Sequence, residues 1–173
     1  MPRGVLRRSD RAMSPEESWR LLTMSFCGRL GTVDAEGWPY VVPKLYVVDE
    51  GRLYFHSSLA LGHTRQNLAA NSKVCFEVDR PGKVFPVNEG DQCATSLSYE
   101  SVIVFGHCRL VEDRDRKRRV LEKLMDKYAD PSWQRPWSFP TLDETAVFEV
   151  TVEQVTGKRR TLAVAENWKE LAD

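Results

Sequence analysis

Two of the chain's three histidines lie in a short polar loop, within the stretch from Phe55 to Val78. The loop joins an alternating apolar segment to a short helical pattern, and its chemically capable residues are His56, Ser57, Ser58, Gly62, His63, Thr64 and Arg65. A helix that begins near Gly62 presents unpaired backbone N–H groups and the positive end of its dipole. These residues predict an anion site of the kind that a phosphate-bearing cofactor requires. The alternative is that the hydroxyl side chains only cap an ordinary helix.

Other kinds of site have less support in the sequence. It contains neither Gly-x-Gly-x-x-Gly nor Gly-x-x-x-x-Gly-Lys-Ser/Thr, so both common nucleotide cradles are excluded. Serine, histidine and acidic residues are available for a hydrolase, but the chain has no Gly-x-Ser-x-Gly elbow. His56 and His107 fall in strand patterns that give no reason for them to converge with His63, and the cysteines lack zinc-site or Cys-x-x-Cys spacing. No metal site is predicted.

Length and composition indicate one globular domain. The chain has 173 residues, and we expect a flexible basic arm over residues 1–13 followed by a single domain over residues 14–173. The 25 basic and 25 acidic residues cancel, which argues against nucleic acid or a membrane surface as a partner and favours a small molecule. No apolar run reaches the roughly 18 to 20 residues of a membrane span, and no secretory signal is recognised, so we expect a cytoplasmic protein.

Periodicity predicts a mainly β protein with peripheral helices. Ser14-Pro15-Glu16-Glu17 is typical of a helix start, and this helix should run to about Cys27. Further helices are expected over 61–70, 112–128 and 166–171, and residues 80–95 are expected to be mostly loop, with a brief strand near Val84. The expected strands cover 28–34, 38–48, 52–57, 74–78, 97–111 and 145–155. Strands that follow one another through short turns favour an antiparallel barrel with helices outside it.

An ordered set of motifs carries a resemblance to a known family. The segments are Gly28-Arg29-Leu30-Gly31-Thr32, Pro39-Tyr40-Val41-Val42-Pro43, Tyr54-Phe55-His56-Ser57, Gly62-His63 and Asn71-Ser72-Lys73-Val74-Cys75-Phe76-Glu77-Val78, followed by the strand around Tyr99 to Gly106. Together they resemble the pyridoxamine 5'-phosphate oxidase-like split-barrel proteins, in particular the nitroimidazole reductase (Nim-type) branch. The resemblance implies a six-stranded antiparallel split β-barrel of the FMN-binding type. It also implies a homodimer with FMN at the subunit interface.

The resemblance assigns site residues as well. It implies that the flavin phosphate is surrounded by His56, Ser57, Ser58, Gly62, His63 and Thr64, and that the isoalloxazine ring lies beside Val41, Val42, Pro43, Lys44 and Leu45. Arg65 is added to the cofactor-binding candidates as a positive charge next to Thr64. Thr64 stands where the family usually has a lysine, and Arg65 follows it directly. Related split barrels bind haem or a deazaflavin, which are therefore the alternative cofactors.

The implied function is an FMN-dependent oxidoreductase that reduces a small electron-poor acceptor such as a nitro-aromatic compound. His63 is the candidate catalytic residue, as a proton donor. The aromatic residues Trp133, Trp137 and Phe139 are expected either to cover the same groove or to pack over the barrel. The alternative function is a non-catalytic flavin- or haem-binding protein that serves as a sensor, store or carrier.

Overall fold

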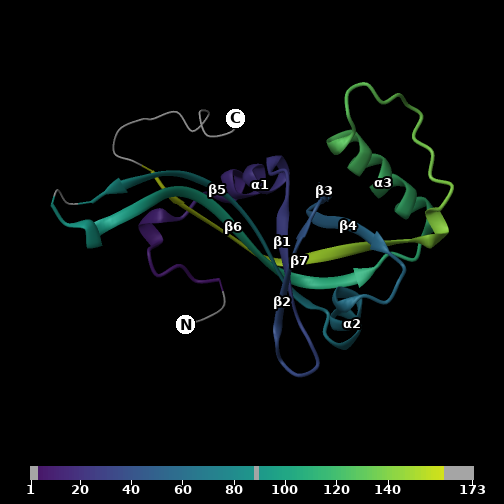
Figure 1. The fold of residues 1–173 in the computed structure, drawn as a ribbon, viewed down its shortest axis with the longest axis horizontal. Coiled ribbons are helices and arrows are strands. Elements are labelled where there is room, and N and C mark those ends of the chain that lie inside the picture. Colours follow the sequence, from purple (N-terminus) through teal and green to yellow (C-terminus); the bar gives the residue numbers. More distant parts are fainter. Residues whose placement is uncertain (1–3, 88–89, 162–173) are drawn as a thin grey trace.

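The computed structural model describes residues 4–87 and 90–161, which form one curled antiparallel sheet with helices around it (Figure 1). The strands are β1 (Gly28–Val33), β2 (Pro39–Lys44), β3 (Val47–Asp49), β4 (Arg52–Ser58), β5 (Lys73–Pro86), β6 (Thr95–Leu110) and β7 (Thr145–Arg160). The helices are α1 (Pro15–Met24), α2 (His63–Ala70) and α3 (Arg114–Tyr128), with short 3₁₀ turns η1 (Ser9–Arg11), η2 (Gln92–Ala94) and η3 (Leu142–Glu144). The strand order is β2-β1-β5-β6-β7-β4-β3, and every pairing is antiparallel.

The sheet curls into a half-barrel because its two edge strands are neighbours in the sequence. β2 and β3 lie at opposite edges of the sheet, yet only Leu45 and Tyr46 connect them, so the edges must approach each other. The expected mainly β, antiparallel fold is confirmed, but the structure has seven strands where the sequence predicted six. The predicted single strand over 38–48 is wrong, because it divides into β2 and β3.

Tyr46 accounts for this division. Its ring is fully buried and its hydroxyl donates to the backbone oxygen of Leu22. The Tyr128 hydroxyl oxygen lies 3.1 Å from the Tyr46 backbone nitrogen and 2.8 Å from its carbonyl oxygen, so both backbone groups bond to a side chain. A residue whose backbone groups are satisfied in this way has none to offer a neighbouring strand.

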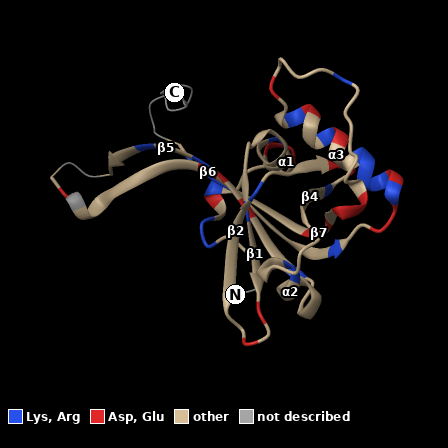
Figure 2. Cartoon of the chain, turned by 45° about the vertical axis from the view of Figure 1, so that its right-hand side comes forward, with Lys and Arg blue, Asp and Glu red and all other residues tan. Residues whose placement is uncertain are grey.

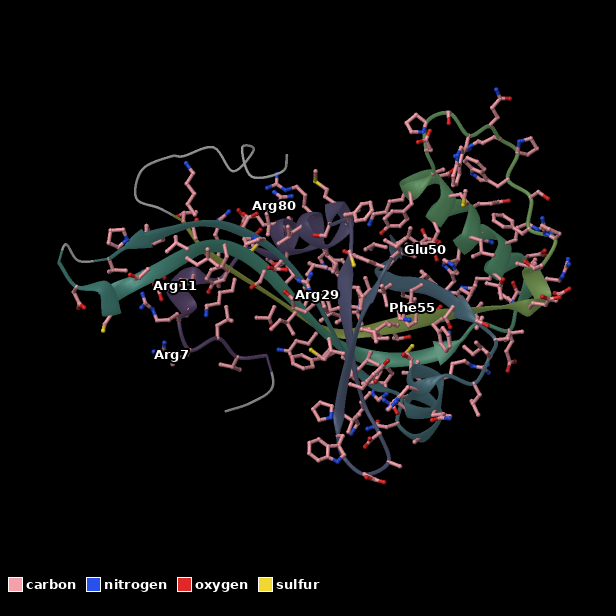
Figure 3. The ribbon with its side chains drawn as sticks, viewed as in Figure 1. Arg7, Arg11, Arg29, Glu50, Phe55 and Arg80 are labelled. Carbon is pink, nitrogen blue, oxygen red and sulfur yellow. The ribbon has the colours of Figure 1, made fainter. Side chains whose placement is uncertain are left out.

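The main hydrophobic core fills the inside of the curl. Alternate residues of β6, β7 and β4 point into it, among them Phe55 on β4, which is labelled in Figure 3. The Phe55 ring stacks on that of Phe148 on β7, with centroids 5.2 Å apart. Leu22 of α1 packs into the same core. A second cluster, which includes Val120 and Val147, lies on the outer face beneath α3. Side chains alternate between the two faces of each strand, so one sheet face is buried inside the curl. Part of the other face is buried under a helix.

β5 and β6 extend beyond the barrel as a two-stranded arm, drawn at the left of Figure 1. The prediction of a mostly loop segment over residues 80–95 is therefore wrong over much of its length. Pro81 and Gly82 suggested a break, but the register between the two strands shifts from Pro81 to Val84 and pairing then continues to Pro86. A bulge of this kind lets a strand absorb residues that do not fit the ladder.

The helices begin and end close to the predicted positions. Ser14 caps α1 as expected, and the structure adds a capping box, in which the Ser14 hydroxyl accepts from Glu17 N–H and the Glu17 carboxylate accepts from Ser14 N–H. α1 ends at Met24 rather than Cys27, because Ser25 turns to an extended conformation. α3 carries both basic and acidic residues (Figure 2), and four basic residues follow one another over 116–119. The expected helix over 166–171 lies outside the described residues.

The segment before α1 lies against β7. Met13 N–H donates to Gly157 O over 3.0 Å, and the Thr156 hydroxyl donates to Gly4 O over the same distance. The division into an arm over residues 1–13 and a domain over residues 14–173 stays a prediction. Within residues 4–87 and 90–161, no helix is long and apolar enough to cross a membrane.

Candidate functional site

The open edge of β2 offers a single backbone donor. In the described part of the chain β2 pairs only with β1, and the bond from Asp34 N–H to Trp38 O (3.0 Å) turns the even-numbered residues of this strand toward β1. Alternation in an antiparallel pair then turns residues 39, 41 and 43 toward the open edge. Pro39 and Pro43 have no N–H group, so Val41 supplies the one edge-facing N–H of β2. The Val41 side chain is 61% exposed at the same place.

The first turn of α2 keeps its N–H groups available. Its N-cap residue is Gly62, and no described side chain accepts a hydrogen bond from the N–H groups of this turn. Ser57 and Ser58 do not cap the helix, since the Ser57 hydroxyl donates to Ser58 O and the Ser58 hydroxyl accepts from Ala60 N–H, each over 3.1 Å. The alternative in which these serines are helix caps is therefore wrong. The helix start combines unpaired donors with a positive dipole end.

A chain of contacts that the sequence did not reveal fixes α2 to the hairpin of β1 and β2. Asn67 is buried and donates from Nδ2 to the Thr32 hydroxyl oxygen over 3.0 Å, and the Thr32 hydroxyl donates to Tyr40 O over 3.3 Å. The Tyr40 ring stacks on the His63 ring with centroids 4.3 Å apart and an angle of 9° between the planes. These contacts bring the start of α2 beside β2. The only signal of this contact in the sequence was the polar residue Asn67 at an inward-facing position of the helix.

Lys44 and His56 form the other side of this region. The Lys44 ammonium lies 5.6 Å from the centre of the Phe55 ring, and burial lowers the pKa of Lys44. Partial burial, and then the positive charge of Lys44, lower the pKa of His56. His56 is therefore a neutral hydrogen-bonding group at pH 7, and the lysine is the positive charge at this end of β2.

The structure places the remaining predicted residues around these two elements. Val42 and Pro43 continue β2, Leu45 follows it with an exposed side chain, and Thr64 and Arg65 lie partly buried in the first turn of α2. The three histidines lie on β4, α2 and β6, and the described residues hold no group of three His, Cys, Asp or Glu side chains suited to a metal ion.

The aromatic segment after α3 contacts its own chain. Trp137 donates from Nε1 to the Asp126 carboxylate over 2.9 Å, and Phe139 packs against the cluster beneath α3. Trp133 is 59% exposed. Packing of this segment is thus described for two of the three aromatic residues, and the expectation that it covers the cofactor groove stays a prediction.

A buried carboxylate holds α3 on the sheet. Glu149 on β7 accepts from the Tyr54 hydroxyl over 2.9 Å and from Arg109 over 2.8 Å, and it also pairs with Arg116 of α3. Burial alone would raise the pKa of Glu149, but the hydrogen bonds from Tyr54 and Arg109 and the arginine charges hold it below the usual value. A carboxylate that bonds to three elements stabilises their relative positions only while it stays ionised.

The donor set fits a phosphate group. The region around α2 and β2 provides helix N–H groups, the Ser58 and Thr64 hydroxyls, the Arg65 guanidinium and the Lys44 ammonium. Phosphate oxygens accept hydrogen bonds, and charge-assisted bonds to them are the strong ones. The open edge of β2 adds a backbone donor and an exposed apolar side chain at Val41, which suit the polar edge and the flat face of a ring system.

Comparisons with known proteins agree with this fold. A solved structure from Bacteroides thetaiotaomicron, described as a candidate 5-nitroimidazole antibiotic resistance protein, is 28% identical, with 85% of each chain covered and a TM-score of 0.71. A FAD-binding protein from Mesorhizobium loti is 28% identical over 87% of this chain and 98% of its own, with a TM-score of 0.59. A flavocytochrome from Azotobacter vinelandii shares the fold at 22% identity, covering 97% of this chain and 78% of its own, with a TM-score of 0.78.

The family comparison covers most of the chain. Among curated proteins, no sequence matches it. The family described as pyridoxamine 5'-phosphate oxidase matches residues 14–159, which include every strand but the last residue of β7 and all three α-helices. The chain therefore belongs to the pyridoxamine 5'-phosphate oxidase family.

Proposed function

We propose that the protein is an FMN-dependent oxidoreductase that reduces a small electron-poor acceptor, with a nitro-aromatic compound as the model substrate. The observation that carries the proposal is the start of α2, whose uncapped N–H groups lie beside the open edge of β2 in a chain of this family. The structure from Bacteroides thetaiotaomicron, which is described as a candidate 5-nitroimidazole resistance protein, supports the choice of acceptor.

In this proposal the chain binds and orients the cofactor and manages one proton. The α2 N–H groups, with Ser58, Thr64 and Arg65, bind the phosphate, and Val41 N–H contacts the polar edge of the ring system. When bound, the flavin supplies the hydride or electrons. Lys44 would place a positive charge beside the bound group and so stabilise negative charge on it. His63 donates a proton to the acceptor, and its stacking on Tyr40 sets the direction of the imidazole.

The proposed assembly is a homodimer with a cofactor in each groove at the interface. Val41 and Leu45 at one edge of the sheet and Trp133 after α3 are exposed apolar residues that a partner subunit would cover. Size-exclusion chromatography with light scattering should give about twice the mass of one 19.9 kDa chain. A single-chain mass in the presence of saturating FMN would overturn the assembly.

A second candidate is a flavin- or haem-binding protein without turnover. Two structural neighbours favour it, since one is named a flavocytochrome and another, from Mycobacterium smegmatis, a FAD and haem binding protein. Thr64, in place of the lysine that is usual in the family, also favours weaker cofactor retention. In this case the acceptor would not be reduced even though the chromophore binds.

The deciding experiment begins with titrations of the purified protein with FMN, FAD, a deazaflavin and haem, followed by visible absorption and flavin fluorescence. The flavin-loaded protein is then reduced without oxygen and mixed with a 5-nitroimidazole. We expect FMN binding and reoxidation of the flavin at a rate proportional to acceptor concentration and above that of free reduced FMN. Binding without faster reoxidation would support the second candidate, and a histidine-dependent Soret band would favour haem.

A matched variant tests the phosphate site directly. Thr64→Lys restores the charge at this position, and a charge-assisted bond contributes about 1.5–3 kcal/mol, so FMN should bind roughly 10-fold more tightly or better. Gln66→Lys adds the same charge on an exposed position of α2 and serves as the control. Equal gains in the two variants would mean that general charge, and not a phosphate at the helix start, governs affinity.

A further inference from the structure

Three side chains on the outer face of the sheet, separate from the start of α2 and from β2, form a continuous hydrogen-bonded chain. The Ser72 hydroxyl oxygen lies 2.8 Å from His107 Nδ1, and His107 Nε2 lies 3.1 Å from Glu153 Oε1. The three residues come from the turn after α2, from β6 and from β7, so 35 and 46 residues separate them in sequence. The sequence offered serine, histidine and acid as residue types only, and the fold brings these three together.

The chemistry of the partners sets the direction of both bonds. An ionised Glu153 can only accept, so the hydrogen of the neutral imidazole lies on Nε2 and points to the carboxylate. Nδ1 then carries a lone pair, and the Ser72 hydroxyl donates to it. A histidine that accepts from a serine and donates to a carboxylate is the arrangement that activates serine nucleophiles.

The backbone holds this chain of side chains in place at two points. Ser72 O accepts from Cys108 N–H over 2.8 Å, which fixes Ser72 next to β6. The register of β6 and β7 shifts between Phe105, opposite Gln154, and Gly106, opposite Val152, so Glu153 is the extra residue of a β-bulge. A bulge of this kind re-aims one side chain, and bulges are frequent beside active sites.

Gly106 makes the bulge possible. A Cβ atom at this position would lie 2.2 Å from the Thr151 backbone oxygen, so β7 approaches β6 more closely than any other residue type would allow. The three functional side chains remain open to solvent, because the His107 and Glu153 side chains are 43% and 40% exposed and Ser72 is also exposed. A small acyl compound can therefore reach the serine.

We propose that Ser72, His107 and Glu153 form a nucleophilic serine site that hydrolyses activated aryl esters of short acids. Ser72 Oγ attacks the ester carbonyl carbon while its proton passes to His107 Nδ1, and Glu153 stabilises the imidazolium. The bond to the phenolate then breaks, the proton on His107 Nδ1 leaves with the phenol oxygen, and acyl-Ser72 and a neutral His107 remain. Water attacks the acyl group, its proton passes to His107, and the acid leaves with restoration of the serine hydroxyl. The activity is independent of flavin, so its test is separate from that of the proposed oxidoreductase.

The experiment uses the whole chain and two probes, p-nitrophenyl acetate and a fluorophosphonate. Phenolate release is followed by absorbance, and phosphonylation is located by mass spectrometry of peptides. We expect the label on Ser72, and hydrolysis about 100-fold slower in Ser72→Ala and in His107→Gln, which is the usual scale for loss of a general base. Glu153→Gln should fall between these and the unmodified chain. Ser138→Ala, which changes an exposed serine on another loop, is the control and should match the unmodified chain.

Two results would overturn the proposal. One is a label on other residues with Ser72 unmodified, and the other is hydrolysis by Ser72→Ala or His107→Gln at the rate of the control. Far-ultraviolet circular dichroism of each variant separates a lost nucleophile from a lost fold. If Ser72→Ala fails to fold, Ser72→Thr replaces it, because threonine keeps the hydroxyl but crowds it with a methyl group. Fluorophosphonate should then label this residue more slowly. The role of the imidazole is decided by His107→Gln.

Discussion

The starts of α1 and α2 differ in how their backbone donors are satisfied. At α1, Ser14 and Glu17 form a capping box within the chain, and at α3 the Asp113 carboxylate accepts from Arg116 N–H over 2.7 Å. At α2, Gly62 has no side chain to accept such a bond, and neither serine before it caps the helix. Two helices are thus capped by their own side chains, while no side-chain cap bond is described at the start of α2. The comparison separates helix starts that the fold completes from the one that we propose to bind a ligand.

The largest expected effect comes from the residue that holds α2 against β1. Asn67→Ala removes a buried donor and leaves the Thr32 hydroxyl without this partner, which should lower the free energy of unfolding by about 1–3 kcal/mol. FMN affinity should also fall, because the start of α2 is no longer fixed beside β2. Urea unfolding and fluorescence titration measure the two quantities, with Gln66→Ala as the control on the same helix. Unchanged FMN affinity in a destabilised Asn67→Ala would show that the position of α2 does not matter for binding.

The backbone donors of α2 can be removed one at a time. His63→Pro deletes the first N–H of the helix, at a position where proline is tolerated because Gly62 is already extended. His63→Ala deletes only the imidazole. We expect His63→Pro to bind FMN about 10-fold more weakly than His63→Ala, since bonds to a charged group contribute about 1.5–3 kcal/mol. Identical dissociation constants for the two variants would remove the helix start from the proposed site.

The capped helices should respond in the opposite way. Ser14→Ala and Asp113→Ala each remove an N-cap side chain and should lower the free energy of unfolding by about 1 kcal/mol. FMN affinity should stay the same in both variants, because neither helix start belongs to the proposed site. Denaturant midpoints and FMN titrations on the same preparations provide the check. A loss of affinity that matches the loss of stability would erase the distinction between the two kinds of helix start.

The smallest effect concerns the far end of α1, where Lys127 of α3 donates to Ser25 O over 2.9 Å and to Tyr46 O over 3.1 Å. Burial lowers the pKa of Lys127 from 10.5 to about 8. The unfolded chain then binds more protons between these two values, so stability should rise as the pH increases from about 8 to 10.5. The rise is small because the side chain is only half-buried and its two carbonyl partners favour the charged form. Thermal unfolding across this range should show a slope that Lys127→Met lacks, and parallel curves would contradict it.

Local patterns in the sequence were sufficient to predict those elements whose structure depends on neighbouring residues. The helix start at Ser14, the turn between β1 and β2 and the helical repeat of α3 were all predicted from residues within a few positions of each other. Two predictions failed at segments whose structure depends on residues far away in the sequence. Tyr128 satisfies the backbone of Tyr46 and divides the strand over 38–48. β5 runs on to Pro86 against β6, where only a brief strand near Val84 was expected within a loop. Neither Tyr128 nor β6 can be identified as a partner from the sequence of the segment that it contacts.

The same distinction holds for the candidate sites. The loop from His56 to Arg65 was recognised because hydroxyl, imidazole and glycine residues follow one another there. The contact from Asn67 to Thr32 joins residues 35 apart, and the contact from Ser72 to His107 spans the same separation. A single sequence contains no signal for such pairs, because any of its polar residues could be a partner until the fold is known. Their discovery required coordinates.

The two prolines of β2 have a consequence for the behaviour of the protein at high concentration. An edge strand with a full row of donors and acceptors is a template on which another chain can add a strand and begin to aggregate. Because Pro39 and Pro43 remove two of the three outward donors, a foreign strand finds the outward carbonyl groups but a single donor, Val41 N–H, and the ladder that it can form is incomplete. A small planar molecule needs no ladder, and one donor is enough for it. The edge can therefore stay open to a ligand without exposing the protein to uncontrolled association.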